Sequence, residues 1–216
     1  KVLNDVYEPR FMDCSYGFRP DRSCHDVIRR INSTIGRRPI GWVVEADIKG
    51  YFDNIDHSWL MKFLEHDIQD KNFLRYVVRF LKAGVMEEGQ HLDSERGSPQ
   101  GGLISPILAN VYLHYVLDIW FEKVVKPRMR GEAYLFRYAD DFLALFEYED
   151  DARKYHEALP KRLGKFNLEV APEKTRMISF GRNSKSKETF DFLGFTHING
   201  KGRKGRYRVV HRTSKK

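Results

Sequence analysis

Cysteine is scarce in this chain of 216 residues, and long hydrophobic runs are absent. The two cysteines, Cys14 and Cys24, form no CxxC pair and no other zinc-binding spacing, which is typical of reduced thiols in a cytoplasmic protein. No apolar run is long enough to span a bilayer and no signal peptide is visible, so we expect no membrane partner. Because the first residue is Lys1 rather than Met, we expect the chain to be part of a longer protein.

Acidic residues are missing from residues 201–216, which hold eight lysines and arginines. The whole chain has 38 basic and 30 acidic residues, so its net charge of +8 comes from this segment and the rest is balanced. A basic segment beside a neutral body fits a polyanionic partner such as nucleic acid. A tail that only aids solubility would have the same composition.

The apolar patterns predict one medium-sized domain, since 41% of the residues are hydrophobic. The expected elements are strands at 42–48, 134–139, 142–147 and 176–180, helical stretches within 57–83, a long helix that ends at Pro127, and a helix at 151–165. This β-α-β-β-α-β order is that of the split ferredoxin-like unit. The expected fold class is therefore α+β, with helices on one face of the sheet.

Two adjacent carboxylates, Asp140 and Asp141, lie in the tight turn between two of these strands. Like charges at this spacing repel, and a divalent cation bound by oxygen ligands offsets such repulsion. The alternative is a hairpin tip whose acids simply face water.

A third carboxylate favours a metal site over a hairpin tip that simply faces water. Asp47 ends the strand 42–48, and in the ferredoxin-like order it can meet the Asp140–Asp141 turn at one edge of the sheet. Three converging carboxylates form a site for two hard cations, Mg²⁺ or Mn²⁺, which would clamp the attacking and leaving oxygens of a phosphoryl transfer. The pattern therefore indicates nucleotidyl transfer in a palm-like domain.

Glycines mark two loops that could approach a ligand. Gly50 allows a sharp turn after Asp47, and the rings of Tyr51 and Phe52 follow it directly. The loop 97–102 contains Gln100, an amide suited to contact a sugar or phosphate.

Two arginines stand near the start of a helix that Asp21 or Ser23 can cap. Arg19 and Arg22 could hold phosphates there, or could be ordinary surface charges.

In five stretches, which occur in the expected order, the chain resembles bacterial reverse transcriptases of the group II intron type, the maturases. Residues 138–141, Tyr-Ala-Asp-Asp, are similar to the YADD box of reverse transcriptases. The other stretches are 16–20 (Tyr-Gly-Phe-Arg-Pro), 47–57 (which begins Asp-Ile-Lys-Gly-Tyr-Phe), 99–110 (which begins Pro-Gln-Gly-Gly) and 192–195 (Phe-Leu-Gly-Phe), the last of which looks like the primer-grip turn. A lone YADD is a weak signal, whereas this ordered set over nearly the whole chain is specific.

The resemblance implies a role for each matching position. Asp47, Asp140 and Asp141 would be catalytic and would bind two Mg²⁺ or Mn²⁺ ions, with the Ile48 carbonyl assisting. The nucleotide-binding residues would be Lys49, Gly50, Tyr51, Phe52, Gln100, Gly101 and Lys174. The residues that bind nucleic acid would be Arg19, Arg22, Phe192, Leu193 and Gly194.

Four of these implied roles are more detailed. Phe52 would be the ring that excludes a ribose 2′-hydroxyl, unless it is a core ring that faces away from the metals. Gln100 would touch the incoming nucleotide, and Gly101 would let it approach. Lys174 would lie near the triphosphate and could protonate the departing pyrophosphate, or it could be a surface lysine in a turn.

By the same resemblance, residues 1–41 would be part of the fingers region, 42–196 the palm, and 197–216 a basic hairpin or tail leading towards a thumb. The implied function is that of an RNA-directed DNA polymerase, which adds dNTPs to a DNA primer on an RNA template. One alternative is an RNA-binding maturase module that aids splicing of intron RNA without polymerase chemistry. Another is a related reverse transcriptase in CRISPR adaptation or phage defence. The three intact aspartates argue against a role in binding alone.

Overall fold

A four-stranded antiparallel sheet lies at the centre of the computed structural model, which describes residues 1–82, 85–87, 90–92, 96–97, 104–202 and 205–214. Its strands are β1 (Trp42–Ala46), β4 (Ala133–Tyr138), β5 (Asp141–Phe146) and β6 (Arg176–Ser179). The strand order is β4-β5-β1-β6, so β1 and β5 are central. The predicted β-α-β-β-α-β order is confirmed, and the hairpin strands begin and end one residue earlier than predicted.

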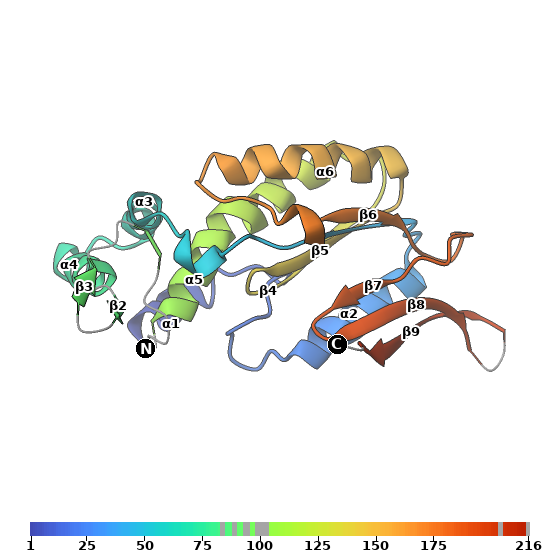
Figure 1. The fold of residues 1–216 in the computed structure, drawn as a ribbon, viewed down its shortest axis with the longest axis horizontal. Helices are drawn as coiled ribbons and strands as arrows, with labels where there is room; N and C mark the ends of the chain where they lie inside the picture. The colour runs from blue at the N-terminus through green and yellow to red at the C-terminus, as the bar shows by residue number, and fades with distance from the viewer. Residues whose placement is uncertain (83–84, 88–89, 93–95, 98–103, 203–204, 215–216) are drawn as a thin grey trace.

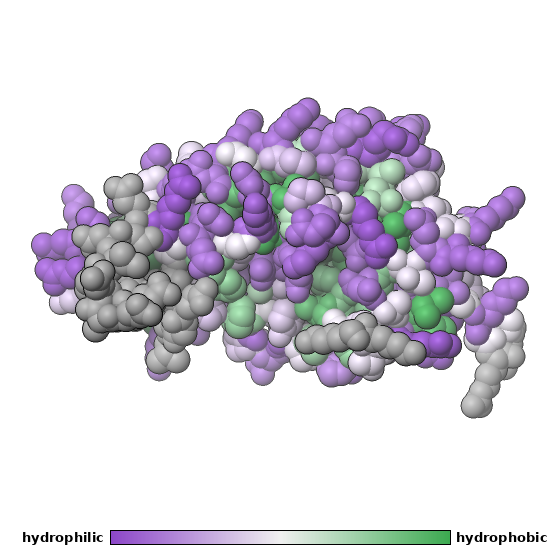
Figure 2. All heavy atoms as spheres, viewed as in Figure 1, coloured by the Kyte–Doolittle hydropathy of each residue, from purple (hydrophilic) through white to green (hydrophobic). Residues whose placement is uncertain are grey.

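Long helices cover one face of this sheet (Figure 1). The first, α5 (Ser105–Leu113), continues through π-helical turns at His114–Asp118 and Phe121–Val125 and a 3₁₀ turn at Lys126–Arg128. The second, α6 (Glu149–Gly164), runs through Pro160 without ending there. Its buried side chains pack on the sheet, and its hydrophilic side chains lie along the upper edge of Figure 2. Alternate residues of the strands, such as Val44 and Ala144, join these helices in the larger core.

The opposite face is also covered, so the expectation of helices on one face alone was incomplete. There α2 (Cys24–Arg37) packs with a second sheet made of β7 (Phe190–Phe192), β8 (Phe195–Lys201) and β9 (Tyr207–Thr213). Val43 and Leu145 point to this side, next in sequence to residues that point to the other. Consecutive apolar residues in a strand indicate that both faces are buried.

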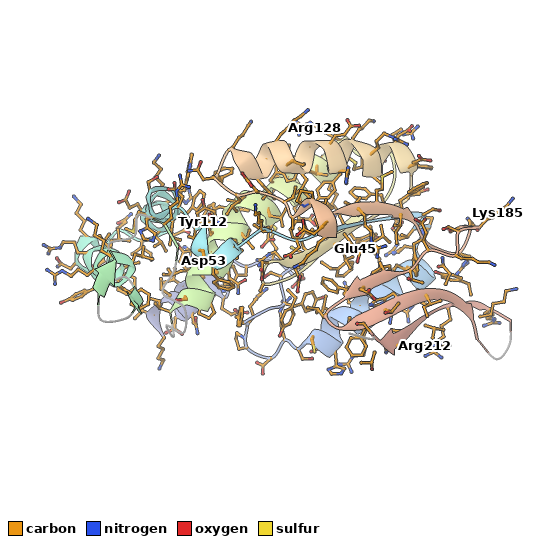
Figure 3. The ribbon with its side chains drawn as sticks, in the orientation of Figure 1. Glu45, Asp53, Tyr112, Arg128, Lys185 and Arg212 are labelled. Atoms are coloured by element: carbon orange, nitrogen blue, oxygen red, sulfur yellow. The ribbon has the colours of Figure 1, made fainter. Side chains whose placement is uncertain are left out.

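The second sheet includes the predicted boundary between the palm and the C-terminal segment. The predicted boundary between residues 196 and 197 falls inside β8, which pairs with β9 along its length. Residues 197–213 lie in β8, β9 and the connection between them, and this hairpin is continuous with β7 through the pairing of β7 with β8. Glu45 of β1 links the two sheets, because its carboxylate accepts from Arg176 Nε (2.6 Å) and from the Asp191 backbone N–H (3.0 Å). Glu45 is labelled in Figure 3 between the two sheets.

The remaining elements are short and lie mainly before α5 in the chain. They are α1 (Val2–Tyr7), α3 (His57–Asp67), α4 (Lys71–Lys82), β2 (Val85–Glu87), β3 (Gln90–Leu92) and 3₁₀ turns at Tyr51–Asp53 and Pro172–Lys174. Ser23 caps α2 in a capping box with Asp26, as the sequence suggested, and Asp56 caps α3. None of the helices described is long and apolar enough to cross a membrane.

Candidate active site

The strand register brings the three predicted carboxylates to one edge of the central sheet. Ala46 of β1 pairs with Phe142 of β5, so the next residues outward, Asp47 and Asp141, follow at the same end. Tyr138 pairs with Asp141, which leaves Ala139 and Asp140 as the two residues of the hairpin turn. Ala139 has a φ of 57°, a left-handed conformation that residues other than glycine rarely adopt. The predicted Asp-Asp hairpin is therefore present, with a strained turn at its tip.

A backbone bridge fixes the position of Asp47 and orients the carbonyl of Ile48. The Ala171 N–H donates to the Asp47 carbonyl and the Lys49 N–H donates to the Glu169 carbonyl, both at 2.9 Å. Ile48 lies between Asp47 and Lys49. In an antiparallel pair bonded in this way, its N–H and C=O groups point to the side opposite residues 169–171. That side is the one on which β5 lies.

The carboxylates repel one another in the absence of a cation. Desolvation, with the charge of Asp47 as a smaller contribution, raises the pKa of Asp140. Desolvation and the charges of Asp140 and Asp47 raise the pKa of Asp141 to about 6. Lys174 Nζ donates to Asp47 Oδ2 at 2.5 Å, and this bond and the charge of Asp47 raise the lysine pKa. An ammonium group therefore offsets part of the charge at this edge.

The donor set fits Mg²⁺ held jointly by protein and phosphate. Within the described ranges, no three His, Cys, Asp or Glu side chains form a ready-made metal cage. Mg²⁺ is usually bound through one or two carboxylates together with substrate phosphates, and keeps several waters. Oxygen donors near one another, with raised pKa values and a lysine partner, match such a partly formed site.

In the turn after Asp47, the aromatic rings of Tyr51 and Phe52 lie in different surroundings. Gly50 has a φ of 53° and begins the 3₁₀ turn Tyr51–Asp53, while Lys49 is exposed. Tyr51 is buried and donates from its hydroxyl to the Ala109 carbonyl at 2.6 Å, so only its backbone can reach a nucleotide. Phe52 is half-buried and packs against the edge of the larger core.

The predicted nucleotide contacts Gln100 and Gly101 lie outside the described residues. The described chain before them is anchored beside Phe52: the Gly97 N–H donates to the Ile55 carbonyl at 2.8 Å. A Cβ on Gly97, whose φ is 87°, would lie 3.3 Å from the Phe52 carbonyl oxygen. Gly97 therefore lies directly against the turn that carries Phe52.

The Phe-Leu-Gly-Phe stretch forms the two-residue hairpin turn between β7 and β8. Phe192 pairs with Phe195, and Leu193 and Gly194 both have positive φ, 51° and 77°, as in the type I′ turns of tight hairpins. Phe192 is buried, whereas Gly194 is exposed. In Figure 1 this turn and the β4–β5 turn lie at the same, left-hand end of their sheets.

The two predicted phosphate-binding arginines are engaged within the protein. Arg19 is buried, pairs with Glu8 at 2.6 Å and donates to the Met12 and Ser15 carbonyls. Arg22 pairs with Asp13 at 2.9 Å and also donates to the Ser15 carbonyl. A phosphate would have to compete with these partners, so both side chains have a clear structural task in the loop before α2.

Sequence reasoning missed Arg137, which precedes the Asp-Asp turn by three residues. Arg137 shares a face of β4 with Ala133 and Leu135, and it is completely buried against Asp118. A charged residue on the inward face of an apolar strand needs a partner, and this was the available signal.

Comparisons with known proteins agree with the resemblance seen in the sequence motifs. The model of the family "Reverse transcriptase (RNA-dependent DNA polymerase)" matches residues 1–197. The group II intron-encoded protein LtrA of Lactococcus lactis subsp. cremoris is 47% identical over 113 residues, which are 52% of this chain and 18% of LtrA. The protein YkfC of Escherichia coli is 28% identical and is matched over 97% of this chain and 61% of its own length. The chain thus spans less than two thirds of these relatives.

A truncated apo telomerase from Candida tropicalis has the same fold, with a TM-score of 0.70 and 17% identity, over 98% of this chain and 43% of that one. The LtrA match agrees with the group II intron resemblance of the sequence motifs. The extent of the family match, from residue 1 to residue 197, places the chain in the reverse transcriptase family of RNA-dependent DNA polymerases.

Proposed function

We propose that this chain carries the nucleotidyl-transfer site of an RNA-directed DNA polymerase of the group II intron type. The observation that carries the proposal is the strand register, which brings Asp47 and the Asp140–Asp141 turn to one edge of the palm sheet. The membership of the reverse transcriptase family supports the same reaction. The substrates would be dNTPs, a DNA primer and an RNA template.

The carboxylates of Asp47, Asp140 and Asp141, with the Ile48 carbonyl, would hold Mg²⁺ or Mn²⁺. When bound, the two ions would stabilise the attacking and leaving oxygens of the transfer. The protein supplies the rest: Phe52 would border the sugar, and Lys174 would face the triphosphate. The ammonium of Lys174 already balances Asp47, and its bond to Asp47 and the charge of that carboxylate raise the lysine pKa.

Asp140→Asn tests this proposal in the complete protein. The change keeps the size of the side chain but removes an anionic oxygen, so we expect primer extension to fall by at least about a thousandfold, since metal ions contribute several kcal/mol to such transfers. Asp150→Asn, at an exposed residue of α6 paired with Arg130, is the matched control and should leave extension unchanged. Primer extension at the wild-type rate by a folded Asp140→Asn protein would show that the assignment is wrong.

A maturase role is a second candidate, favoured by the similarity to a group II intron-encoded protein. An RNA-binding module that aids splicing would need the basic surface of β8 and β9 but not the carboxylates. Splicing assays on the same Asp140→Asn protein separate the two functions. Loss of extension with splicing retained would mean that one chain performs both tasks on different surfaces.

A further inference from the structure

A fully buried ion pair joins β4 to the π-helical turn His114–Asp118. Arg137 donates to both carboxylate oxygens of Asp118, from Nε at 2.8 Å and from Nη2 at 2.7 Å. Both side chains are 0% exposed. Burying two charges removes the hydration of both, so such a pair often adds little stability compared with apolar residues of the same volume. The remaining contacts of the pair indicate a task other than stability.

The other N–H groups of Arg137 reach the turn that carries the aspartates. Nη1 donates to Asn110 Oδ1 and to the Ala139 carbonyl, both at 2.9 Å, and Nη2 donates to Ser15 Oγ at 2.7 Å. With the two bonds to Asp118, all five donors of the guanidinium are used. The guanidinium is planar and rigid, so its partners hold it in one orientation. It is thus a fixed donor beneath the Ala139–Asp140 turn.

The turn is also held from its other side. Asn110 Nδ2 donates to the Gly17 carbonyl at 2.7 Å, and a Cβ on Gly17 would lie 2.4 Å from the Ala139 nitrogen. Ala139 therefore contacts the backbone of Gly17 through its nitrogen and the guanidinium of Arg137 through its carbonyl oxygen. Its positive φ is a strained conformation, and strain of this kind persists only where the surroundings enforce it.

We propose that Arg137, oriented by Asp118, is a positioning residue that sets the backbone of the Ala139–Asp140 turn and so the places of the Asp140 and Asp141 carboxylates. Arg137 is completely buried and acts through the turn rather than by touching a nucleotide. This inference rests on the proposed function: the effect on cation binding needs only the proposed metal site, whereas the effect on the reaction needs polymerase activity as well. A misplacement of about 1 Å in catalytic groups can lower a rate by roughly a hundredfold.

Two variants of the complete protein test the proposal. Arg137→Lys keeps the positive charge but has one amine in place of the five-donor fork. The double variant Arg137→Met with Asp118→Leu removes both charges, so neither is left buried and unpaired. We expect kcat for dNTP addition and the affinity for Mn²⁺, measured by electron paramagnetic resonance without nucleotide or nucleic acid, to fall about 10- to 100-fold. KM for the dNTP should stay near its wild-type value, since the substrate contacts are intact.

Arg162→Met is the matched control. Arg162 donates to the carbonyls of Tyr115 and Val116 in the same π-helical turn, but not to the Ala139–Asp140 turn. This variant should lose thermal stability while its kcat and Mn²⁺ affinity stay at wild-type values.

Each other outcome has a defined meaning. If the Arg137 variants fold and their Mn²⁺ affinity and kcat fall no further than those of Arg162→Met, the positioning role is rejected. If neither Arg137 variant folds, the pair supports the whole domain rather than the turn, and the proposal is equally rejected. If the wild-type protein binds Mn²⁺ but extends no primer, the proposed function fails, and the Mn²⁺ affinities alone decide on Arg137.

Discussion

At the scale of single residues, we propose that Phe52 distinguishes deoxyribose from ribose. Its ring follows the Gly50 turn directly after Asp47, and it is half-buried at the edge of the core. A 2′-hydroxyl placed against the ring would lose its water without gaining a partner. Such a loss costs about 1–3 kcal/mol, which gives roughly ten- to hundredfold discrimination before any steric clash.

Phe52→Val should therefore keep dNTP incorporation and raise rNTP incorporation by roughly ten- to hundredfold. The measurement is single-nucleotide primer extension by the complete protein with each kind of nucleotide, together with a thermal melt. Loss of both activities and of thermal stability would identify Phe52 as a core ring. Unchanged rejection of rNTPs by a folded, active variant would place sugar selection elsewhere.

Site residues could be predicted where a short motif carries them. The two adjacent acids of the hairpin and the acid at the end of β1 were placed correctly, because strand pairing over a few residues decides where they lie. The tasks of Tyr51 and Arg19 could not be predicted in this way. Tyr51 bonds Ala109, and Arg19 bonds Glu8, and only the packing of distant segments shows that these side chains face inward.

At the scale of elements, one buried histidine of the sheet β7–β9 contacts α2. His197 of β8 is 0% exposed, stacks on Phe190 at 4.4 Å between ring centroids, and contacts Asn32 of α2 through Nδ1 at 3.1 Å. Burial and the charge of His211 lower its pKa from 6.5 to about 4, while Asp191 acts in the opposite sense. The neutral form is therefore the one that holds this sheet to α2.

Acid should weaken that attachment. The unfolded chain binds a proton at this histidine below about pH 6.5, whereas the folded chain does so only near pH 4, so stability is full above pH 6.5 and is lost as the pH falls between the two. The loss approaches about 3 kcal/mol, since each pKa unit corresponds to about 1.4 kcal/mol. Urea unfolding of the chain at pH 7.5 and pH 5 measures the part of this loss that falls between these two pH values, about 2 kcal/mol.

The matched variants are His197→Phe, which keeps a stacking ring, and His156→Gln on α6. The first should flatten the dependence of stability on pH, and the second should leave it as in the wild type. An equally steep dependence in His197→Phe would assign the acid sensitivity to other groups.

The order of elements was more predictable than their packing. Alternating and helical patterns are local, so they gave the four palm strands and α6 to within about two residues. That α2 and the second sheet cover the other face depends on contacts between segments far apart, such as Asn32 with His197. The boundary expected at residue 196 falls inside β8, because the strand pairing of β8 with β7 and β9 is not a composition signal.

At the scale of the whole molecule, some basic side chains are paired within the protein and others are exposed to solvent. Arg19 and Arg22 are bound within the protein, so of the basic residues predicted to meet nucleic acid, those of β8 and β9 remain the candidates for binding phosphate. The exposed basic side chains among the described residues of this hairpin are Lys201, Arg206, Arg208 and Arg212. Arg212 is labelled on β9 in Figure 3.

The isolated chain should bind an RNA–DNA duplex weakly and with steep salt dependence, because neutralised phosphates release their counterions. Changing Arg208 and Arg212 to Gln should reduce the slope of log affinity against log salt by about 0.9 for each phosphate that the protein no longer neutralises. The control is Lys154→Gln on α6, on the opposite side of the palm sheet. Tight binding that does not respond to salt, or slopes equal in all three proteins, would contradict this account.

The central position of β1 has a consequence for how the chain reaches its folded state. Both neighbours of β1, the strands Asp141–Phe146 and Arg176–Ser179, come much later in the sequence. Pairings of this kind must close long loops before they gain energy, and they form slowly. On the ribosome, β1 has two unpaired edges until the hairpin and β6 have emerged, at about 5–20 residues per second. Because Asp47 and Asp141 meet only when β1 has paired with β5, the divalent-cation binding proposed for them should appear only after that step and can serve as its reporter.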